Sequence, residues 1–233
     1  MSEEDRLNQY VLNGLHAREC WRLFRIIAEF VDGFEVLPHY YPAVTLFGST
    51  RVKPDHPYYQ KAEEVARLLV KEGFSVLTGG GPGIMEAANK GAAEAGGNSI
   101  GLNIKLPMEQ QPNPYSNVKL EFRYFFVRKV MMVKYAVAFV CFPGGFGTMD
   151  ELFEAVTLVQ THKIRPVPVV IVGSDYWAGL FEWLKKRVLE EGMISPEDMD
   201  IVQLLDDPTE IVRFIKDRAI LKTEHYLRQK VWG

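Results

Sequence analysis

The chain has 233 residues, of which 47% are hydrophobic and 24% charged, and its formal net charge is −3. These values are ordinary for a globular protein with one sizeable core. The net charge excludes an overall basic field that would attract nucleic acid, so any bound anion requires a local site. The apolar run from Val130 to Phe142 contains Lys134 and is too short to span a bilayer, so we expect no membrane partner.

We find neither the pattern of a signal peptide nor the residue spacing of a metal site in the sequence. The N-terminus, Met1 to Asp5, is acidic and does not have the basic-then-apolar order of a signal peptide. Cys20 and Cys141 lie far apart among apolar neighbours, so we expect a reduced cytoplasmic protein with Cys141 in the core. The five histidines form no pair at i, i+4 spacing, so we predict no metal site.

Apolar residues recur at helical spacing from about residue 3 to 31, which predicts one or two amphipathic helices that cover a sheet face or form a subunit contact. Beyond them, apolar runs alternate with segments of helical period. The predicted strands are residues 43–47, 74–77, 98–103, 119–122, 136–142, 167–172 and 201–204. The predicted helices are residues 58–71, 82–95, 125–135, 148–161, 176–191 and about 208–228.

This alternation predicts one α/β domain, residues 1–233, with a Rossmann-like parallel sheet and helices on both faces, three layers in all. Ligands bind such sheets at the carboxyl ends of the strands. Three strand-to-helix turns carry glycine there, and we expect them at one rim: Gly48-Ser49, Gly79–Gly83 and Gly144–Gly147. The long polar segment Lys105–Asn117 is predicted to be a functional loop beside them.

The turn Pro143–Thr148 follows the most apolar predicted strand and leads into a helix. Its glycines allow close backbone approach, while a helix start offers unpaired N–H groups and a positive dipole end. A phosphate group suits that environment. The spacing matches neither a Walker loop nor the dinucleotide fingerprint.

Glu151, just after this turn, has two interpretations. With Thr148 it forms the Thr-x-x-Glu pattern of a capping box, in which both side chains satisfy helix N–H groups. Alternatively, its carboxylate takes part in a reaction. Similarly, Glu86 either caps the helix after Gly79–Gly83 or holds a substrate hydroxyl, and the pattern leaves both questions open.

Three segments in order resemble the Lonely Guy family of nucleotide phosphoribohydrolases, long labelled lysine decarboxylase-like. They are Gly79–Ala87, Arg128-Lys129-x-x-Met132 and Pro143–Glu151, and Gly48-Ser49 also fits. The resemblance covers roughly residues 43–205. Members of that family hydrolyse the N-glycosidic bond of a nucleoside 5′-monophosphate, such as a cytokinin riboside 5′-monophosphate or AMP, and release the base and ribose 5-phosphate.

The resemblance implies that Arg128 and Glu151 are catalytic, and that no cofactor is used. It also implies a homo-oligomer, a dimer or hexamer, with sites at the subunit interface. The implied substrate-binding residues are Gly48, Ser49, Gly80, Gly81, Met85, Glu86, Arg128, Lys129, Gly144, Gly145, Gly147 and Thr148.

The implied reaction builds positive charge on the ribose, which the Glu151 carboxylate can stabilise while it orients a water molecule. Arg128 either binds the phosphate or assists departure of the base. The alternative function is a non-catalytic carrier of a nucleotide or of molybdenum cofactor on the same fold. A pyridoxal-phosphate decarboxylase is disfavoured, because no Ser-x-His-Lys segment occurs. Which base is released stays open.

Overall fold

The computed structural model describes residues 19–105 and 111–230, so the predicted helical residues 3–18 lie outside the described part. The described N-terminal helix is α2 (Glu19–Val36), which continues past the predicted end at residue 31 to a short 3-10 helix. It continues because its last turns pack on α5 (Phe125–Lys134). Gly33 lies against Met131, and the ring of Phe34 lies 5.5 Å from the Nζ atom of Lys134.

The seven predicted strands form one parallel sheet, with the order β4-β3-β2-β1-β5-β6-β7. Their bounds lie within two residues of the predictions, because strands buried on both faces appear in the sequence as short apolar runs. The strands are β1 (Ala43–Phe47), β2 (Ser75–Thr78), β3 (Ser99–Ile104), β4 (Val118–Phe122), β5 (Ala136–Cys141), β6 (Val169–Ile171) and β7 (Val202–Leu204).

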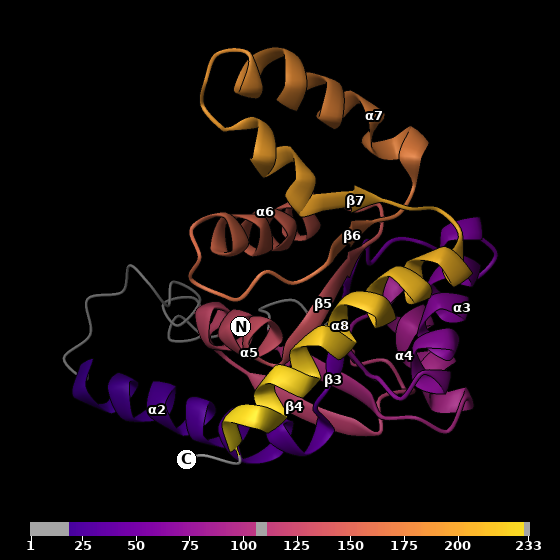
Figure 1. Ribbon diagram of the computed structural model, residues 1–233. Coiled ribbons are helices and arrows are strands. Elements are labelled where there is room, and N and C mark those ends of the chain that lie inside the picture. Colours follow the sequence, from indigo (N-terminus) through magenta and orange to yellow (C-terminus); the bar gives the residue numbers. More distant parts are fainter. Residues whose placement is uncertain (1–18, 106–110, 231–233) are drawn as a thin grey trace, which may run out of the picture.

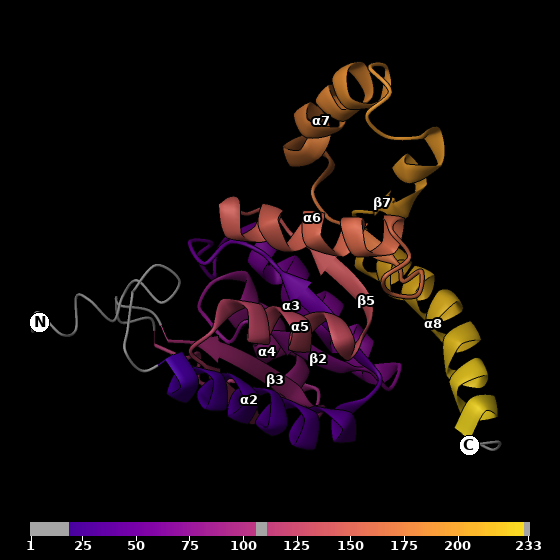
Figure 2. The ribbon, with the colours of Figure 1, turned by 90° about the vertical axis from the view of Figure 1, so that its left-hand side faces the viewer.

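Helices cover both faces of the sheet, which confirms the predicted three layers (Figures 1 and 2). One layer contains α3 (Pro57–Lys71), α4 (Ile84–Glu94) and α8 (Pro208–Lys230), and the other contains α2, α5 and α6 (Phe146–Gln160). In β1, Val44 and Leu46 face the first layer, while Ala43 and Phe47 face the second. The sheet is therefore buried on both sides. No helix in the described ranges is long and apolar enough to cross a membrane.

The strand order places a switch point between β1 and β5. From β1 the chain proceeds outward through β2, β3 and β4, then returns to the centre and proceeds the other way through β6 and β7. The turns that follow β1 and β5 consequently diverge to opposite sides of the sheet. They leave a crevice at the carboxyl ends of these two strands, the usual ligand site in such folds.

The segment between β6 and β7 differs from its prediction as one helix over 176–191. A regular helix, α7 (Ser174–Trp183), changes at Leu184 to a π-helical turn that ends at Leu189. The N–H of Glu190 donates to the carbonyl of Lys185, five residues earlier, at 3.2 Å, which closes the wider turn. The segment extends away from the body of the sheet in both ribbon views (Figures 1 and 2).

The packing of α3 on α4 generates a stability prediction. A Cβ atom at Gly91 would overlap the backbone carbonyl of Glu63, which cannot rotate away. We expect Gly91→Ala to lower the free energy of unfolding by about 1–3 kcal/mol in urea titrations, the usual cost of overpacking. As a control, Gly179→Ala in α7 adds a Cβ with nothing within 4 Å and should stabilise by up to about 1 kcal/mol through helix propensity. Equal stability of the two variants would contradict this packing.

Candidate functional site

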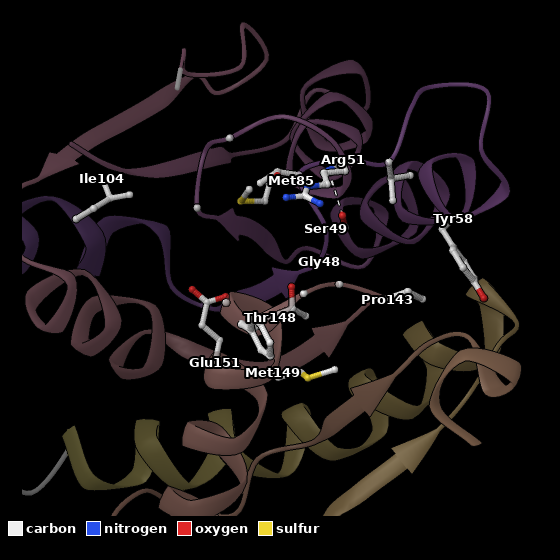
Figure 3. Close-up of a pocket in the computed structure, with 18 of the residues that line it drawn as sticks. Gly48, Ser49, Arg51, Tyr58, Met85, Ile104, Pro143, Thr148, Met149 and Glu151 are labelled. Atoms are coloured by element: carbon white, nitrogen blue, oxygen red, sulfur yellow. Dashed lines mark hydrogen bonds between the residues drawn. The ribbon is translucent and has the colours of Figure 1, made fainter. Parts of the chain in front are cut away.

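A cavity of about 850 Å³ opens at the switch point, between the turns that follow β1 and β5 (Figure 3). Glu151 and Thr148 of α6 lie across it from Ser49, Arg51 and Met85. Ten of the predicted site residues line this cavity, so the expected convergence of the glycine turns on one rim is observed. They are Gly48, Ser49, Gly81, Met85, Arg128, Gly144, Gly145, Gly147, Thr148 and Glu151.

The start of α6 forms one wall of the cavity. The helix begins at Phe146, with Gly145 as its N-cap residue and no side-chain hydrogen bond to the cap. Thr148 is therefore the third helical residue, and the capping-box interpretation of Glu151 is wrong. The N–H groups of a first helical turn have no partner within the helix, so here they are available to a ligand in the cavity.

The turns after β1 and β5 are tied to each other at this wall. The N–H of Ser49 donates to the carbonyl of Pro143 at 3.0 Å. A Cβ atom at Gly144 would overlap the hydroxyl of Thr148 and would lie 3.0 Å from the Ser49 nitrogen. Only glycine allows this approach, which fixes the glycine turn against the end of β1.

Arg128 and Glu151 form an ion pair beside the turn. The Nη2 atom of Arg128 lies 3.5 Å from the Oε1 atom of Glu151, and the two side chains are 10% and 16% exposed. The Nε atom of Arg128 is buried and has no hydrogen-bond partner. The guanidinium therefore retains an unused donor next to the cavity, and its central carbon also lies 5.2 Å from the centroid of the Phe125 ring.

Burial sets the protonation of this pair. It raises the pKa of Glu151 to about 7, although Arg128 and Lys129 act in the opposite direction. Burial likewise lowers the pKa of Arg128, which the carboxylate of Glu151 partly offsets. A carboxyl group that titrates near neutral pH can both accept and donate a proton, which is the property of a general acid or base.

Two contacts fix the helix that carries Arg128. The carboxylate of Glu29 in α2 accepts hydrogen bonds from the N–H groups of Arg123, at 2.9 Å, and Tyr124, at 3.3 Å, just before α5 begins. Near the other end, the buried hydroxyl of Thr45 donates to the carbonyl of Met132 at 2.9 Å. The N-terminal helix thus supports the candidate site, since it holds the backbone that leads into α5 from a distance of more than 90 residues in sequence.

The glycine turn after β2 is pinned by the loop that follows β3. The backbone N–H of Asn113 donates to the carbonyl of Gly80 at 2.9 Å. The side-chain amide of Asn113 donates to the carbonyl of Gly81 at 3.0 Å. Asn113 belongs to the predicted loop 105–117, of which residues 106–110 lie outside the described part. None of the described residues of that loop lines the cavity.

Three predicted site residues lie outside the lining. Gly80, with φ +71°, packs on the side chain of Asn103. Glu86 accepts a hydrogen bond from the hydroxyl of Tyr59 at 3.1 Å. Lys129 bridges to α6 through Asp150, at 2.6 Å, and Glu154, at 3.2 Å. Consecutive side chains along a helix point about 100° apart. The side chain of Glu86 therefore points away from that of Met85, and the side chain of Lys129 points away from that of Arg128.

The cavity also contains residues that the motifs did not indicate: Thr50, Arg51, His56, Tyr58, Asn103, Phe125 and Tyr176. Most of them follow the carboxyl end of a strand, where ligands bind such sheets. A search of the segment after every predicted strand would therefore have found the region of Tyr176 after β6. Cys141 is fully buried, and burial raises the pKa of its thiol, which confirms its prediction as a core residue. Among described residues, no cluster of His, Cys, Asp or Glu suits a metal ion.

Known sequences that are similar to this chain include one family model and several plant proteins with the same enzyme name. A family model described as "Possible lysine decarboxylase" matches residues 85–215. A cytokinin riboside 5′-monophosphate phosphoribohydrolase of Arabidopsis thaliana is 30% identical over 166 residues, 70% of this chain and 76% of that protein. A probable enzyme of the same name from this plant is 34% identical over 163 residues, 68% of this chain and 79% of that protein.

Solved structures share the fold. The molybdenum cofactor binding protein of Rippkaea orientalis has a TM-score of 0.58 and 20% identity, covering 76% of this chain and 96% of that one. The molybdenum cofactor carrier protein of Chlamydomonas reinhardtii has a TM-score of 0.56 and 22% identity, with the same coverage of both chains. At such identities the likeness concerns the fold alone.

The raised pKa of Glu151 is directly measurable. We expect the signal of its carboxyl carbon in NMR spectra to titrate near pH 7, above the ordinary value of 4.5. Because the folded pKa lies above the unfolded one, the stability contributed by this group is complete below pH 4.5 and is lost as the pH rises through 7. Arg128→Met removes the nearby cation and should raise the pKa further. Glu151→Gln identifies the signal, and a midpoint near 4.5 would refute the effect of burial.

Proposed function

The chain belongs to the Lonely Guy family of phosphoribohydrolases, and from this membership we propose that it hydrolyses the N-glycosidic bond of a nucleoside 5′-monophosphate. The products are a free base and ribose 5-phosphate. The substrates proposed are the cytokinin riboside 5′-monophosphate named for its relatives and AMP. The observation that carries the proposal is the buried Arg128–Glu151 pair, which borders the same cavity as the glycine turn.

The 5′-phosphate binds at the start of α6 in this proposal. Unpaired backbone N–H groups and the positive end of the helix dipole favour a dianion there. The hydroxyl of Thr148 lies in the same first turn and lines the cavity. Fixing the phosphate orients the ribose toward Glu151, three residues further along the helix, and so contributes to catalysis by positioning.

Glu151 acts on the ribose carbon that bears the base. As the bond from C1′ to the base nitrogen breaks, its electron pair goes to the base, and positive charge develops on the sugar. The carboxylate stabilises that charge and accepts a proton from the water whose oxygen bonds to C1′. The departing base takes up a proton from solvent, and Glu151 then releases its own proton to solvent, which restores the carboxylate. Arg128 and Lys129 lower the pKa of Glu151 against the effect of burial, and a pKa of about 7 leaves a substantial fraction of the carboxyl group ionised at neutral pH.

We also propose that the protein is a homo-oligomer, a dimer or a hexamer, whose interface adjoins the cavity. The helices α2 and α5 lie side by side (Figures 1 and 2) and expose large apolar side chains. Apolar surface of this kind marks contacts with other proteins. Phe125 belongs both to this surface and to the cavity lining. The exposed residues are Trp21, Leu23, Phe24, Ile27, Val31, Phe34, Phe125, Phe126 and Val130.

The role of Glu151 has a direct test. We expect Glu151→Gln to keep the fold but to reduce the release of adenine from AMP by about 100-fold or more, the loss typical of one acid–base group. Base and ribose 5-phosphate are separated by chromatography after incubation with AMP, and isopentenyladenosine monophosphate is tested in parallel to rank the substrates.

The matched control is Asp150→Asn on the same helix. The side chain of Asp150 is 60% exposed and pairs with Lys129 outside the cavity, so this variant should retain most of the activity. A Glu151→Gln variant as active as the wild type would remove Glu151 from the mechanism. Wild-type protein that binds AMP without releasing adenine would instead favour the carrier function.

The proposed interface predicts a change in mass in solution. Wild-type protein should scatter light as a multiple of 26.6 kDa. Phe24→Asp places an unpaired charge on the apolar face and should weaken association by at least about tenfold, which corresponds to 1.4 kcal/mol. Met193→Asp changes an equally exposed apolar side chain elsewhere and should leave the mass unchanged. A monomeric wild-type protein would exclude the oligomer.

A further inference from the structure

We propose that Tyr176 is a positioning residue of the phosphate-binding turn. In this proposal its hydroxyl orients the peptide unit between Gly144 and Gly145 so that the N–H group of that unit points to the 5′-phosphate. The inference rests on the proposed function, which places a phosphate at the start of α6. It assigns a role to α7, a helix outside the three segments that resemble the family.

The contact that carries the inference joins α7 to the glycine turn. The hydroxyl of Tyr176 donates a hydrogen bond to the carbonyl oxygen of Gly144, at 2.7 Å. Tyr176 lines the cavity together with Gly144 and Gly145, and 46% of the residue is exposed. The distance is typical of a strong hydroxyl–carbonyl hydrogen bond.

Because the peptide bond is planar, the hydrogen bond to the Gly144 carbonyl also fixes the direction of the Gly145 N–H. In a planar trans peptide, the carbonyl of one residue and the N–H of the next point in opposite directions. A hydrogen bond that holds the Gly144 carbonyl toward Tyr176 therefore directs the Gly145 N–H to the other side. That N–H has no acceptor among the described residues and is free to bind a ligand.

Two consecutive glycines make such a restraint necessary. Without side chains, the peptide unit between them can rotate at little cost. Gly144 is held by Thr148 and Ser49, whereas a Cβ atom at Gly145 would meet nothing within 4 Å. A rotated unit would present a carbonyl oxygen instead of an N–H group to a phosphate, and the two negative charges would repel. The carbonyl of Gly145 is fixed as an acceptor for the N–H of Met149 in α6, at 3.1 Å, and Tyr176 fixes the carbonyl of Gly144 on the other side of this peptide unit.

Tyr176 is itself held firmly, although the segment that follows it extends away from the sheet. At the start of α7, the carboxylate of Asp206 accepts hydrogen bonds from the N–H groups of Gly173, at 2.6 Å, and Ser174, at 3.3 Å. Although burial opposes it, these hydrogen bonds keep the pKa of Asp206 below its usual range, so the carboxylate stays ionised at neutral pH.

The neighbouring residue anchors the same turn of the helix. Trp177 is buried, and its indole N–H donates to the carbonyl of Val172 at 3.1 Å. Its ring meets that of Tyr176 edge to face, with 4.9 Å between centroids. The position of the Tyr176 hydroxyl is therefore set by a buried aromatic contact and a capped helix start, as a positioning role requires.

The test is Tyr176→Phe, which removes one oxygen atom and keeps the ring. We expect the KM for AMP to rise about five- to tenfold, as for one lost hydrogen bond, while kcat changes less than twofold because the phosphate is remote from the reacting carbon. The dissociation constant of ribose 5-phosphate, measured by calorimetry, should rise by the same factor. The affinity for free adenine should not change, since adenine carries no phosphate.

A control variant on the same helix separates positioning from general damage. Trp183→Phe changes an exposed side chain outside the cavity and should behave as the wild type in every assay. Unchanged affinity for AMP and ribose 5-phosphate in Tyr176→Phe would overturn the inference. Equal losses for adenine and ribose 5-phosphate would overturn it as well, because they would indicate a disturbed cavity rather than a reoriented peptide.

The same experiments distinguish this inference from the proposed function. If the wild-type protein binds ribose 5-phosphate but releases no base from any nucleoside monophosphate, the hydrolysis fails. Weaker binding of ribose 5-phosphate by Tyr176→Phe would still uphold the role of the tyrosine. If the wild-type protein binds neither ribose 5-phosphate nor inorganic phosphate, both proposals are refuted.

Discussion

The candidate site depends on a carboxyl group and a guanidinium group that lie side by side in a largely buried position. Charges in such a place lose most of their hydration, and their mutual attraction repays that loss only when the geometry is held. The surroundings of Arg128 and Glu151 supply this restraint. The carboxylate of Glu29 holds the N–H groups just before the helix of Arg128, and the hydroxyl of Thr45 holds the carbonyl of Met132 near its other end. Contacts at both ends of α5 therefore keep the guanidinium of Arg128 beside Glu151.

The sheet provides the frame on which this pair is placed. β1 and β5 are adjacent, and the helices that follow them depart to opposite sides, so the carboxyl ends of both strands are free of covering structure. The glycine turn and the end of β1 fill that position closely, through Gly144, Thr148 and Ser49. The turn proposed to bind the phosphate and the carboxylate proposed to accept the proton thereby lie at one rim, each on backbone that the core holds in place.

The sequence alone was sufficient for the fold and for much of the candidate site. Buried parallel strands are short apolar runs, and the glycine turns between strands and helices mark the rim, so β1 to β7 and ten lining residues were predictable. The predictions failed where a side chain's direction on its helix, or a contact between residues far apart in the sequence, determines the structure. The side chain of Lys129 points away from that of its neighbour Arg128 because a helix turns. The partners of Glu29 and Tyr176 lie 94 and 32 residues away, and no local pattern encodes such contacts.

The projecting segment between β6 and β7 has a consequence for how such a protein diversifies. The part of this segment that lies farthest from the sheet is on the surface, so insertions and substitutions there are tolerated more readily than in the core. Its first turn, in contrast, meets the backbone of the glycine turn through a single hydroxyl. Under the proposed function, substitutions in a peripheral element can thus adjust how tightly the phosphate end of a ligand is held while Glu151 remains unaltered. Affinity and chemistry would then evolve separately within one cavity.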